Sequence, residues 1–408
     1  MVIARLRSTP GGPWYAAILL AAVVSLALFG ILGVGRQGSG GFDMAFLYAA
    51  GRTWLNGLNA YVLVQRQASV GTFPFDIYAF AYPPPIFPLA IGLGYFSFAT
   101  AKLLMLGLNL LSAVALSAYC VRMAEPGAGT APRAPPGDAY RWVIPAIIMG
   151  NPFTAHVLWM GQTTLIVAAS IAWGCRFAGQ GRWLLGGLLL AVSTIKPQFS
   201  VFAFLWLAMQ RRWPSILAAG ALSLAFALGP LLISGPLTAI RSWLDEIKVY
   251  QAYPSNTVGF EHSFGLQSML YHLGIAVPSG LLIALAFATV IFLVRSKILE
   301  DDILPLTLGV ALLLSVAHDY DLILAAPLVP ALWRHLRDRG WRGALIALAI
   351  MCVMFLPQRL LKPLESSALL QFRVLILLGL IIWLFVLSAN VARRNIQAAS
   401  AAAPLNIK

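Results

Sequence analysis

Asp43 is the residue of this chain whose type and position are best suited to acid–base chemistry. It follows the first long apolar segment, in a sequence of 408 residues of which only 10% are charged. A carboxylate at the edge of a membrane can take a proton from a hydroxyl group, because desolvation raises its basicity toward neutral pH. Asp is also a favourable N-cap for a following helix. The sequence leaves both roles open, and the two are compatible.

Lys196 is the cation of greatest interest. It lies in an apolar stretch beside Pro197, and no acidic residue is near it in the sequence. A buried ammonium without a counter-charge is costly in a membrane. We therefore expect either an anionic ligand such as a phosphate, or a side chain that extends to the membrane surface. Pro197 also favours a break in the apolar segment 183–209, because proline removes a helical hydrogen bond.

A short polar segment late in the chain offers further chemistry. His318 stands beside Asp319, whose carboxylate could orient the imidazole toward a phosphate; alternatively, the histidine caps a turn. Residues 319–321 imitate the metal-binding Asp-x-Asp of nucleotide-sugar enzymes. They lack the soluble α/β setting of those enzymes, so we do not favour a metal and expect no cofactor.

The composition defines the class of protein that must position these residues. Hydrophobic residues make up 60% of the chain and the mean hydropathy is +0.82. Runs this apolar must be helices, because unpaired backbone groups are too costly in hydrocarbon. We expect an all-α integral membrane protein with one domain, residues 1–408. The formal net charge of +14 falls largely at the ends of apolar segments. This is the positive-inside pattern, and it argues against a nucleic-acid partner.

We predict about twelve spans, some of them shorter than a perpendicular crossing needs. They are residues 14–34, 84–98, 103–121, 142–159, 163–177, 183–209, 215–233, 279–294, 303–317, 322–333, 344–356 and 369–387.

The basic loops predict that both termini are cytoplasmic and that two long connections, 35–82 and 234–278, lie outside. The short turn at 318–321 falls on the same outer face. Apolar residues recur at near-helical spacing between Asp43 and Leu58, which predicts a helix lying in the membrane interface. The Ala-rich tail, 395–408, is expected to be disordered.

An ordered series of short motifs resembles a known family. Gly41-Phe42-Asp43 with Tyr48, then Tyr82-Pro83-Pro84, Gly161-Gln162 and Lys196-Pro197 are similar to the polyprenyl-phosphate-sugar-dependent glycosyltransferases of family 87. That family belongs to the GT-C superfamily and includes α-1,2-mannosyltransferases. The chain departs from the family's Gly-Gln-x-Asn, since Thr164 stands in place of the asparagine.

The resemblance implies an inverting transfer of a hexose, mannose in the first place, from a polyprenyl phosphate to a glycolipid or glycan. It implies work at the outer face of a bacterial cytoplasmic membrane, with Asp43 as the general base. Lys196, His318 and Arg359 are candidates for contact with the donor phosphate. The candidates for contact with the sugar or acceptor are Tyr48, Tyr82, Gln162, Gln198, His262 and Asp319.

Several of these residues also have a purely structural interpretation: Tyr82 could belong to a scaffold segment, and Gln162 could serve in helix packing. Two other functions fit the composition. A transporter or flippase of lipid-linked sugars would also be polytopic and basic, and it predicts paired acids and bases within the spans. A ligase or polymerase using lipid-diphosphate donors would share the outer loops.

Overall fold

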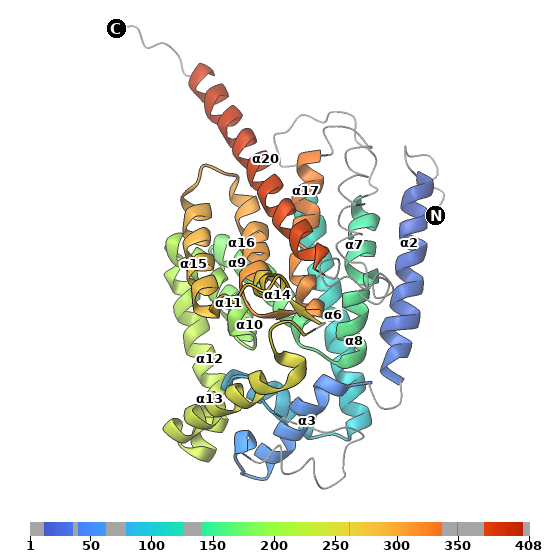
Figure 1. Ribbon diagram of the computed structural model, residues 1–408, viewed down its shortest axis with the longest axis vertical. Helices are drawn as coiled ribbons and strands as arrows, with labels where there is room; N and C mark the ends of the chain where they lie inside the picture. Colours follow the sequence, from blue (N-terminus) through green and yellow to red (C-terminus); the bar gives the residue numbers. More distant parts are fainter. Residues whose placement is uncertain are drawn as a thin grey trace.

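The computed structural model describes residues 12–35, 40–62, 79–125, 140–260, 262–336, 349 and 371–402. These ranges are built almost wholly of helices, most of which run along one long direction (Figure 1). The start of α2 (Gly12–Ser25) and the end of α20 (Phe372–Ala402) lie at the upper end of that view. Helices α3 (Phe42–Leu55) and α13 (Pro236–Ala252) lie at the lower end, which we call the α3 end.

The other α-helices are α5 (Phe87–Gly94), α6 (Phe98–Ala124), α7 (Tyr140–Gly150), α8 (Pro152–Met160), α9 (Thr164–Gly179), α10 (Trp183–Ser193), α11 (Pro197–Met209), α12 (Trp213–Ser234), α14 (Leu266–His272), α15 (Ser279–Arg295), α16 (Glu300–Leu314) and α17 (Leu328–Leu336). A π-helical turn, η1 (Leu26–Ile31), continues α2. The 3₁₀ turns are η2 (Leu32–Gly35), η3 (Pro84–Ile86), η4 (Pro254–Asn256) and η5 (Asp319–Ala325).

Several helices have the length and composition to cross a membrane. Within the described ranges there are four, at Ala16–Gly35, Phe98–Ala124, Trp213–Ser234 and Phe372–Ala398. The pair α7 and α8, bent by 50° at Asn151, makes a fifth if it is counted as one broken span. The chain is therefore a helical membrane protein. Of the other expected spans, 84–98, 163–177, 183–209 and 279–294 contain shorter apolar helices, whereas 322–333 divides between the 3₁₀ turn η5 and the short helix α17. A total near twelve stays a prediction.

The helix breaks have local causes. Asn151 ends α7 and caps α8, because its Oδ1 accepts the backbone N–H groups of Phe153 and Thr154 at 3.0 and 2.9 Å. The segment 183–209 divides into α10 and α11, and α11 begins at Pro197, where the missing N–H costs nothing. The break predicted at this proline is confirmed, and it leaves Lys196 at a helix end.

Helix α3 differs from the expected interfacial helix, because most of its residues are buried. It packs closely against α5: a Cβ on Gly51 would lie 1.9 Å from the carbonyl oxygen of Ala90. The spacing of its apolar residues predicted the helix correctly. The same spacing could not show that α5 covers the other face of α3, because a contact between two helices is not visible in the sequence of either one.

The second long connection forms ordered structure at the α3 end. Helix α13 lies over residues 79–82, where Trp243 donates from Nε1 to the Ala81 carbonyl at 3.0 Å and Glu246 accepts the N–H of Phe80 at 3.0 Å. Strands β1 (Ser263–Phe264) and β2 (Ala317–His318) then pair antiparallel, with Ser263 opposite His318. The otherwise helical fold thus contains this one short ladder among its described residues.

The C-terminal part closes the core and extends beyond it. Every residue of α16 from Asp302 to Leu314 is buried, and η5 follows it in the centre of the molecule. Helix α20 continues to Ala402, so residues 395–402 are helical where disorder was expected. Alanine is the strongest helix former, and a helix already nucleated upstream propagates through such residues readily. The expected span 344–356 lies almost wholly outside the described residues.

Candidate active site

Asp43 lies in the first turn of α3, where the helix dipole favours a negative charge. The N-cap is Gly41, in the left-handed region at φ +81°, and its N–H donates to the Trp159 carbonyl at 2.7 Å. A Cβ on Gly41 would come within 2.8 Å of the Lys102 side chain. Glycine is thus required there, and Asp43 does not serve as the N-cap. Its carboxylate is left for other partners.

Gln162 holds the Asp43 carboxylate. Its Nε2 donates to Asp43 Oδ2 at 2.7 Å and to the Tyr320 hydroxyl at 3.0 Å. Its Oε1 accepts from the Tyr82 hydroxyl at 3.1 Å and from the Thr163 N–H at 3.2 Å. All four hydrogen-bonding positions of the amide are used, which fixes its orientation. Four segments distant in sequence meet at this one side chain.

Gly161 places Gln162 against α3. It ends α8 in the left-handed conformation, at φ +71°, and a Cβ there would lie 2.6 Å from the Met44 Cβ. Only glycine allows both the turn and this close approach. The turn therefore explains why a glycine precedes Gln162, which the sequence alone did not show.

The environment of Asp43 alters its acidity. Burial raises the pKa of Asp43 to about 7, and the charge of Asp321 acts in the same direction. The hydrogen bond from Gln162 and the charge of Lys196 act against this and lower the pKa. The result is a carboxyl group that changes protonation near neutral pH, as a general base requires.

Lys196 has an acidic partner that is far away in the sequence. Its Nζ donates to Asp321 Oδ1 at 2.6 Å and to the Thr164 hydroxyl at 2.7 Å. Thr164 in turn donates to the same carboxylate oxygen at 2.8 Å, and the Tyr320 ring lies 5.0 Å from Nζ. Lys196 and Asp321 are 7% and 1% exposed, so this is a buried ion pair. The counter-charge sought for Lys196 is therefore supplied by the protein itself.

His318 lies beside this ion pair. Its backbone N–H donates to Asp321 Oδ2 at 3.0 Å, its ring stacks on Tyr320 with centroids 5.2 Å apart, and Nε2 is 3.2 Å from the Tyr250 hydroxyl of α13. Burial lowers the pKa of His318, so the neutral imidazole is favoured at pH 7. His318 thus caps the turn η5, one of its two expected roles. The carboxylate expected to orient its ring, that of Asp319, faces His262 instead, and contact of the His318 ring with a phosphate stays a prediction.

Asp319 pairs with His262 across the β1–β2 ladder. Asp319 Oδ2 is 3.2 Å from His262 Nδ1, and the Asp319 N–H donates to the His262 carbonyl at 3.0 Å. Burial acts to raise the pKa of Asp319, but the His262 hydrogen bond and nearby positive charges outweigh it and lower the pKa. Asp319 and Asp321 thus face different basic residues, His262 and Lys196. No group of three metal-ligating acidic, histidine or cysteine residues occurs in the described ranges.

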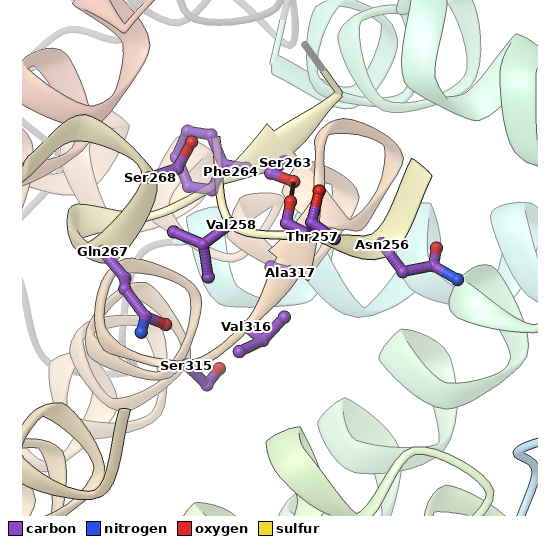
Figure 2. A pocket seen from close by; sticks show the side chains of 10 residues that line it. All are labelled: Asn256, Thr257, Val258, Ser263, Phe264, Gln267, Ser268, Ser315, Val316 and Ala317. Carbon is purple, nitrogen blue, oxygen red and sulfur yellow. Dashed lines mark hydrogen bonds between the residues drawn. The ribbon is translucent and has the colours of Figure 1, made fainter. Parts of the chain in front are cut away.

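A small cavity lies beside the same ladder, in a loop that contains Thr257 and Ser263. Figure 2 shows the side chains that line it, with the hydrogen bond from Ser263 to the Thr257 carbonyl at 2.9 Å. Its volume of about 20 Å³ has room for roughly one water molecule. It is too small for a sugar ring.

The structure brings together most, but not all, of the residues expected at the site. Tyr48 donates to the Phe96 carbonyl at 3.2 Å and packs on Phe98. Gln198 is exposed in the first turn of α11. Arg359 lies outside the described residues. The contacts of Tyr48, Gln198 and Arg359 with substrate therefore stay predictions.

Sequence reasoning missed three members of the site: Tyr320, Asp321 and Thr164. The signal for Asp321 was present, because a lysine in an apolar helix requires an anion and this aspartate is one of only a few acids in apolar surroundings. Thr164 was noted only as a departure from the family pattern, yet it bridges the ion pair.

Comparison with known families identifies the family of the chain. The sequence model of glycosyltransferase family 87 matches residues 80–317, more than half of the chain, and the chain therefore belongs to this family. The match includes Tyr82, Gln162 and Lys196. The segment 318–321 follows directly after its end, whereas Asp43 lies well before its start at residue 80. Neither a curated protein nor a solved structure matches the chain. The protein is thus a glycosyltransferase of the membrane, with sugar donor and acceptor as substrates.

Proposed function

We propose that this glycosyltransferase transfers a hexose, mannose in the first place, from a polyprenyl phosphate to a hydroxyl group of a glycolipid or glycan. The reaction takes place at the outer face of the cytoplasmic membrane and inverts the anomeric centre. Nucleotide sugars are cytoplasmic, so an enzyme that works outside needs a donor carried on lipid. The proposed fold is of the GT-C type, and the α3 end is the outer end.

The observation that carries this proposal is the Asp43 carboxylate, held by Gln162 and with a pKa of about 7. As general base, Asp43 takes the proton of the acceptor hydroxyl as that oxygen attacks the anomeric carbon. The bond from this carbon to the donor phosphate breaks, and the electron pair leaves with the phosphate. Gln162 fixes the carboxylate while the attack occurs.

The departing phosphate needs positive charge or hydrogen-bond donors. A lysine ammonium has three hydrogens, of which Asp321 and Thr164 accept two, so one is available in this arrangement for a donor oxygen. His318 adds an N–H donor when it is protonated or in the suitable tautomer. Arg359 is a third candidate, as a basic residue expected on the outer side of the membrane. Asp321 therefore orients Lys196 rather than competing with the donor.

Tyr82, His262 and Asp319 are proposed to contact the sugars. Tyr82 reaches Gln162 from the segment that enters α5, and His262 keeps part of its ring exposed while Asp319 holds its Nδ1. Polar groups fixed by neighbours in this way are suited to recognise hydroxyl groups with defined geometry.

Transfer of a radiolabelled mannosyl group from polyprenyl phosphate to membrane glycolipids tests the proposal. We expect Asp43→Asn to lose at least a hundredfold in rate while remaining folded, since general-base catalysis contributes about 10²–10⁴. The control is Asp245→Asn, which removes an exposed acid of α13 that pairs with Lys248 on the same helix. Near-normal turnover of folded Asp43→Asn removes this residue from the mechanism. Analysis of the anomeric configuration of the product tests inversion separately.

One observation favours a second function. The buried pair of Lys196 and Asp321 is the kind of intramembrane ion pair that transporters contain. Reconstituted vesicles distinguish the two functions. Movement of a lipid-linked sugar across the bilayer without any glycosidic product supports a transporter, whereas product without translocation supports the transferase.

A further inference from the structure

Helix α13 begins where a membrane span ends. The span α12 has 22 residues, which make about 33 Å of helix, and a bilayer's hydrocarbon core is about 30 Å thick. Gly235, at φ +77°, turns the chain between Ser234 of α12 and Pro236 of α13. Figure 1 shows α13 lying across the α3 end. Leu237 follows Ser234 by three residues, which reach at most about 11 Å, so the first turn of α13 lies at a membrane surface.

The inner face of α13 is occupied by the protein itself. Trp243 and Glu246 lie on this face and make the two hydrogen bonds to residues 79–82 that are described above. Tyr250, one turn further along the helix, has its hydroxyl 3.2 Å from His318 Nε2. The inner face of α13 therefore packs against two segments of the candidate active site.

The outer face of α13 carries a stripe of exposed leucine and isoleucine. Leu237, Ile240 and Leu244 recur at helical spacing, and they are 71%, 43% and 46% exposed. Leu244 and the buried Glu246 lie about 160° apart around the helix, so the stripe points away from the inner face. An apolar stripe on a helix that follows a membrane span is typical of helices lying in the interface, with the apolar side in the acyl boundary.

Two basic residues border this stripe. Arg241 and Lys248 are exposed, and each follows a leucine of the stripe by four residues, one helical turn. Long basic side chains in this position extend to the headgroup phosphates while their methylene groups stay in the apolar layer. Lys248 also pairs with Asp245 at 2.7 Å, so the outer face carries little net charge. The stripe therefore fits the interface of a bilayer in general and requires no acidic lipid.

We propose that α13 is an interfacial helix, and that its partner is the headgroup and upper acyl layer of the bilayer that α12 crosses. Leu237, Ile240 and Leu244 enter the acyl boundary, and Arg241 reaches the headgroup phosphates. The interfacial role expected of α3 thus falls to α13. The bilayer holds the outer face of the helix while the inner face holds residues 79–82, which links the candidate active site to the membrane surface. This contact depends neither on the substrate nor on which side of the membrane the α3 end faces.

Spin labelling of the full chain in phosphatidylcholine liposomes tests the contact. With the native cysteines replaced, nitroxides are attached to Leu244→Cys and, as the matched control, to Val249→Cys. Val249 is 44% exposed and lies about 140° around the helix from Leu244. Oxygen concentrates in lipid and a nickel complex stays in water. We expect the ratio of oxygen to nickel collisions to be roughly threefold higher or more at Leu244→Cys than at Val249→Cys.

Two results would overturn the proposal. One is an equal preference of both labels for the nickel complex, which would place the stripe in water. The other is a Leu244→Cys label that neither reagent reaches, because such a label would be covered by a protein partner and not by lipid.

A charge placed in the stripe tests the link to the candidate active site. The buried N–H of Phe80 donates to Glu246 at 3.0 Å, so its hydrogen exchange reports whether α13 is seated on residues 79–82. In nanodiscs, Leu244→Asp should speed this exchange roughly tenfold or more, whereas Val249→Asp should leave it near wild type. Leu237→Asp serves if thermal unfolding shows that Leu244→Asp does not fold. Equal exchange at Phe80 in the stripe variant and in Val249→Asp overturns the link.

Discussion

Gln162 donates a hydrogen bond of 2.7 Å to Asp43 across 119 positions of sequence. The same amide binds Tyr82 and Tyr320, so α3, the turn after α8, the segment before α5 and η5 converge on it. A carboxylate fixed by a fully bonded amide keeps one orientation when its protonation changes. This relationship makes the proposed base testable by pH as well as by substitution.

The rate of transfer should depend on pH through Asp43. Because the ionised form is the base and the pKa is about 7, we expect the rate to rise with pH and level off above 7. At pH 6 the rate should be roughly a tenth of its maximum, since one unit below the pKa about a tenth of the groups are ionised. Initial rates between pH 5 and 9 check this. A flat profile contradicts the assignment.

The same shift predicts a change in stability. A carboxyl group whose pKa is raised on folding stabilises the fold in its protonated form, and this contribution is lost as pH rises through about 7. Asp43→Asn, which is always neutral, should therefore unfold at a higher temperature than wild type at pH 8. The gain should be on the order of 1–2 kcal/mol, allowing for partial exposure, and should shrink toward pH 4. Thermal unfolding in detergent at several pH values measures it.

Gln162→Leu should move the pH profile upward. The Gln162 hydrogen bond lowers the pKa of Asp43, so its removal raises that pKa further. We expect the rising limb to shift to higher pH and the maximum rate to fall roughly tenfold or more through loss of orientation. The control is Gln210→Leu, a half-buried glutamine bonded to Glu300 and distant in sequence from the site. If the rate rises over the same pH range in Gln162→Leu as in wild type, Gln162 does not act on the pKa of Asp43.

The ion pair of Lys196 and Asp321 should show strong coupling. Its side chains are 8% and 2% exposed, so Asp321→Asn or Lys196→Met leaves a buried charge alone and should cost about 3–5 kcal/mol. The double variant should be more stable than the sum of the single losses predicts. For the exposed pair of Lys248 and Asp245, the same cycle should give about 0–1 kcal/mol. Additive losses at Lys196 and Asp321 would contradict the pairing.

Gly51→Val should separate α3 from α5. Its Cβ would meet the Ala90 carbonyl at 1.9 Å, so one helix must move, and Asp43 moves with α3. We expect a destabilisation of roughly 2 kcal/mol or more together with loss of transfer. Gly107→Ala in α6 is the control, because a Cβ there meets nothing within 4 Å. It should be neutral or slightly stabilising. Equal behaviour of the two variants would argue against the tight contact.

Labelling can establish on which side the α3 end lies. Asn56 is exposed just after α3, and Lys297 is exposed between α15 and α16. The connection between these two helices lies at the end of the bundle opposite α3 (Figure 1). With the native cysteines replaced, a membrane-impermeant maleimide added to intact cells should label Asn56→Cys and leave Lys297→Cys unlabelled. The reverse pattern would place Asp43 in the cytosol and rule out the proposed reaction.

The sequence by itself determined the class of the protein. Apolar runs in a chain of mean hydropathy +0.82 have only helices open to them in a membrane, so the helical class followed from composition. Asp43 and Lys196 were singled out from the sequence because charged residues in apolar surroundings require a reason, whereas Gln162 and His318 were singled out through the family resemblance. Their roles in catalysis stay predictions. Pro197 also indicated the helix break, because proline lacks the backbone N–H that a continuous helix requires.

Only the tertiary structure decided which of these residues meet. Asp321 lies 125 residues from Lys196, and no periodicity or local propensity encodes such a pairing. The burial of α3 likewise depended on the contact between Gly51 and α5. Local sequence governs backbone hydrogen bonds and helix ends, whereas the partner of a buried charge is set by which helices pack together. That packing is a property of the whole chain.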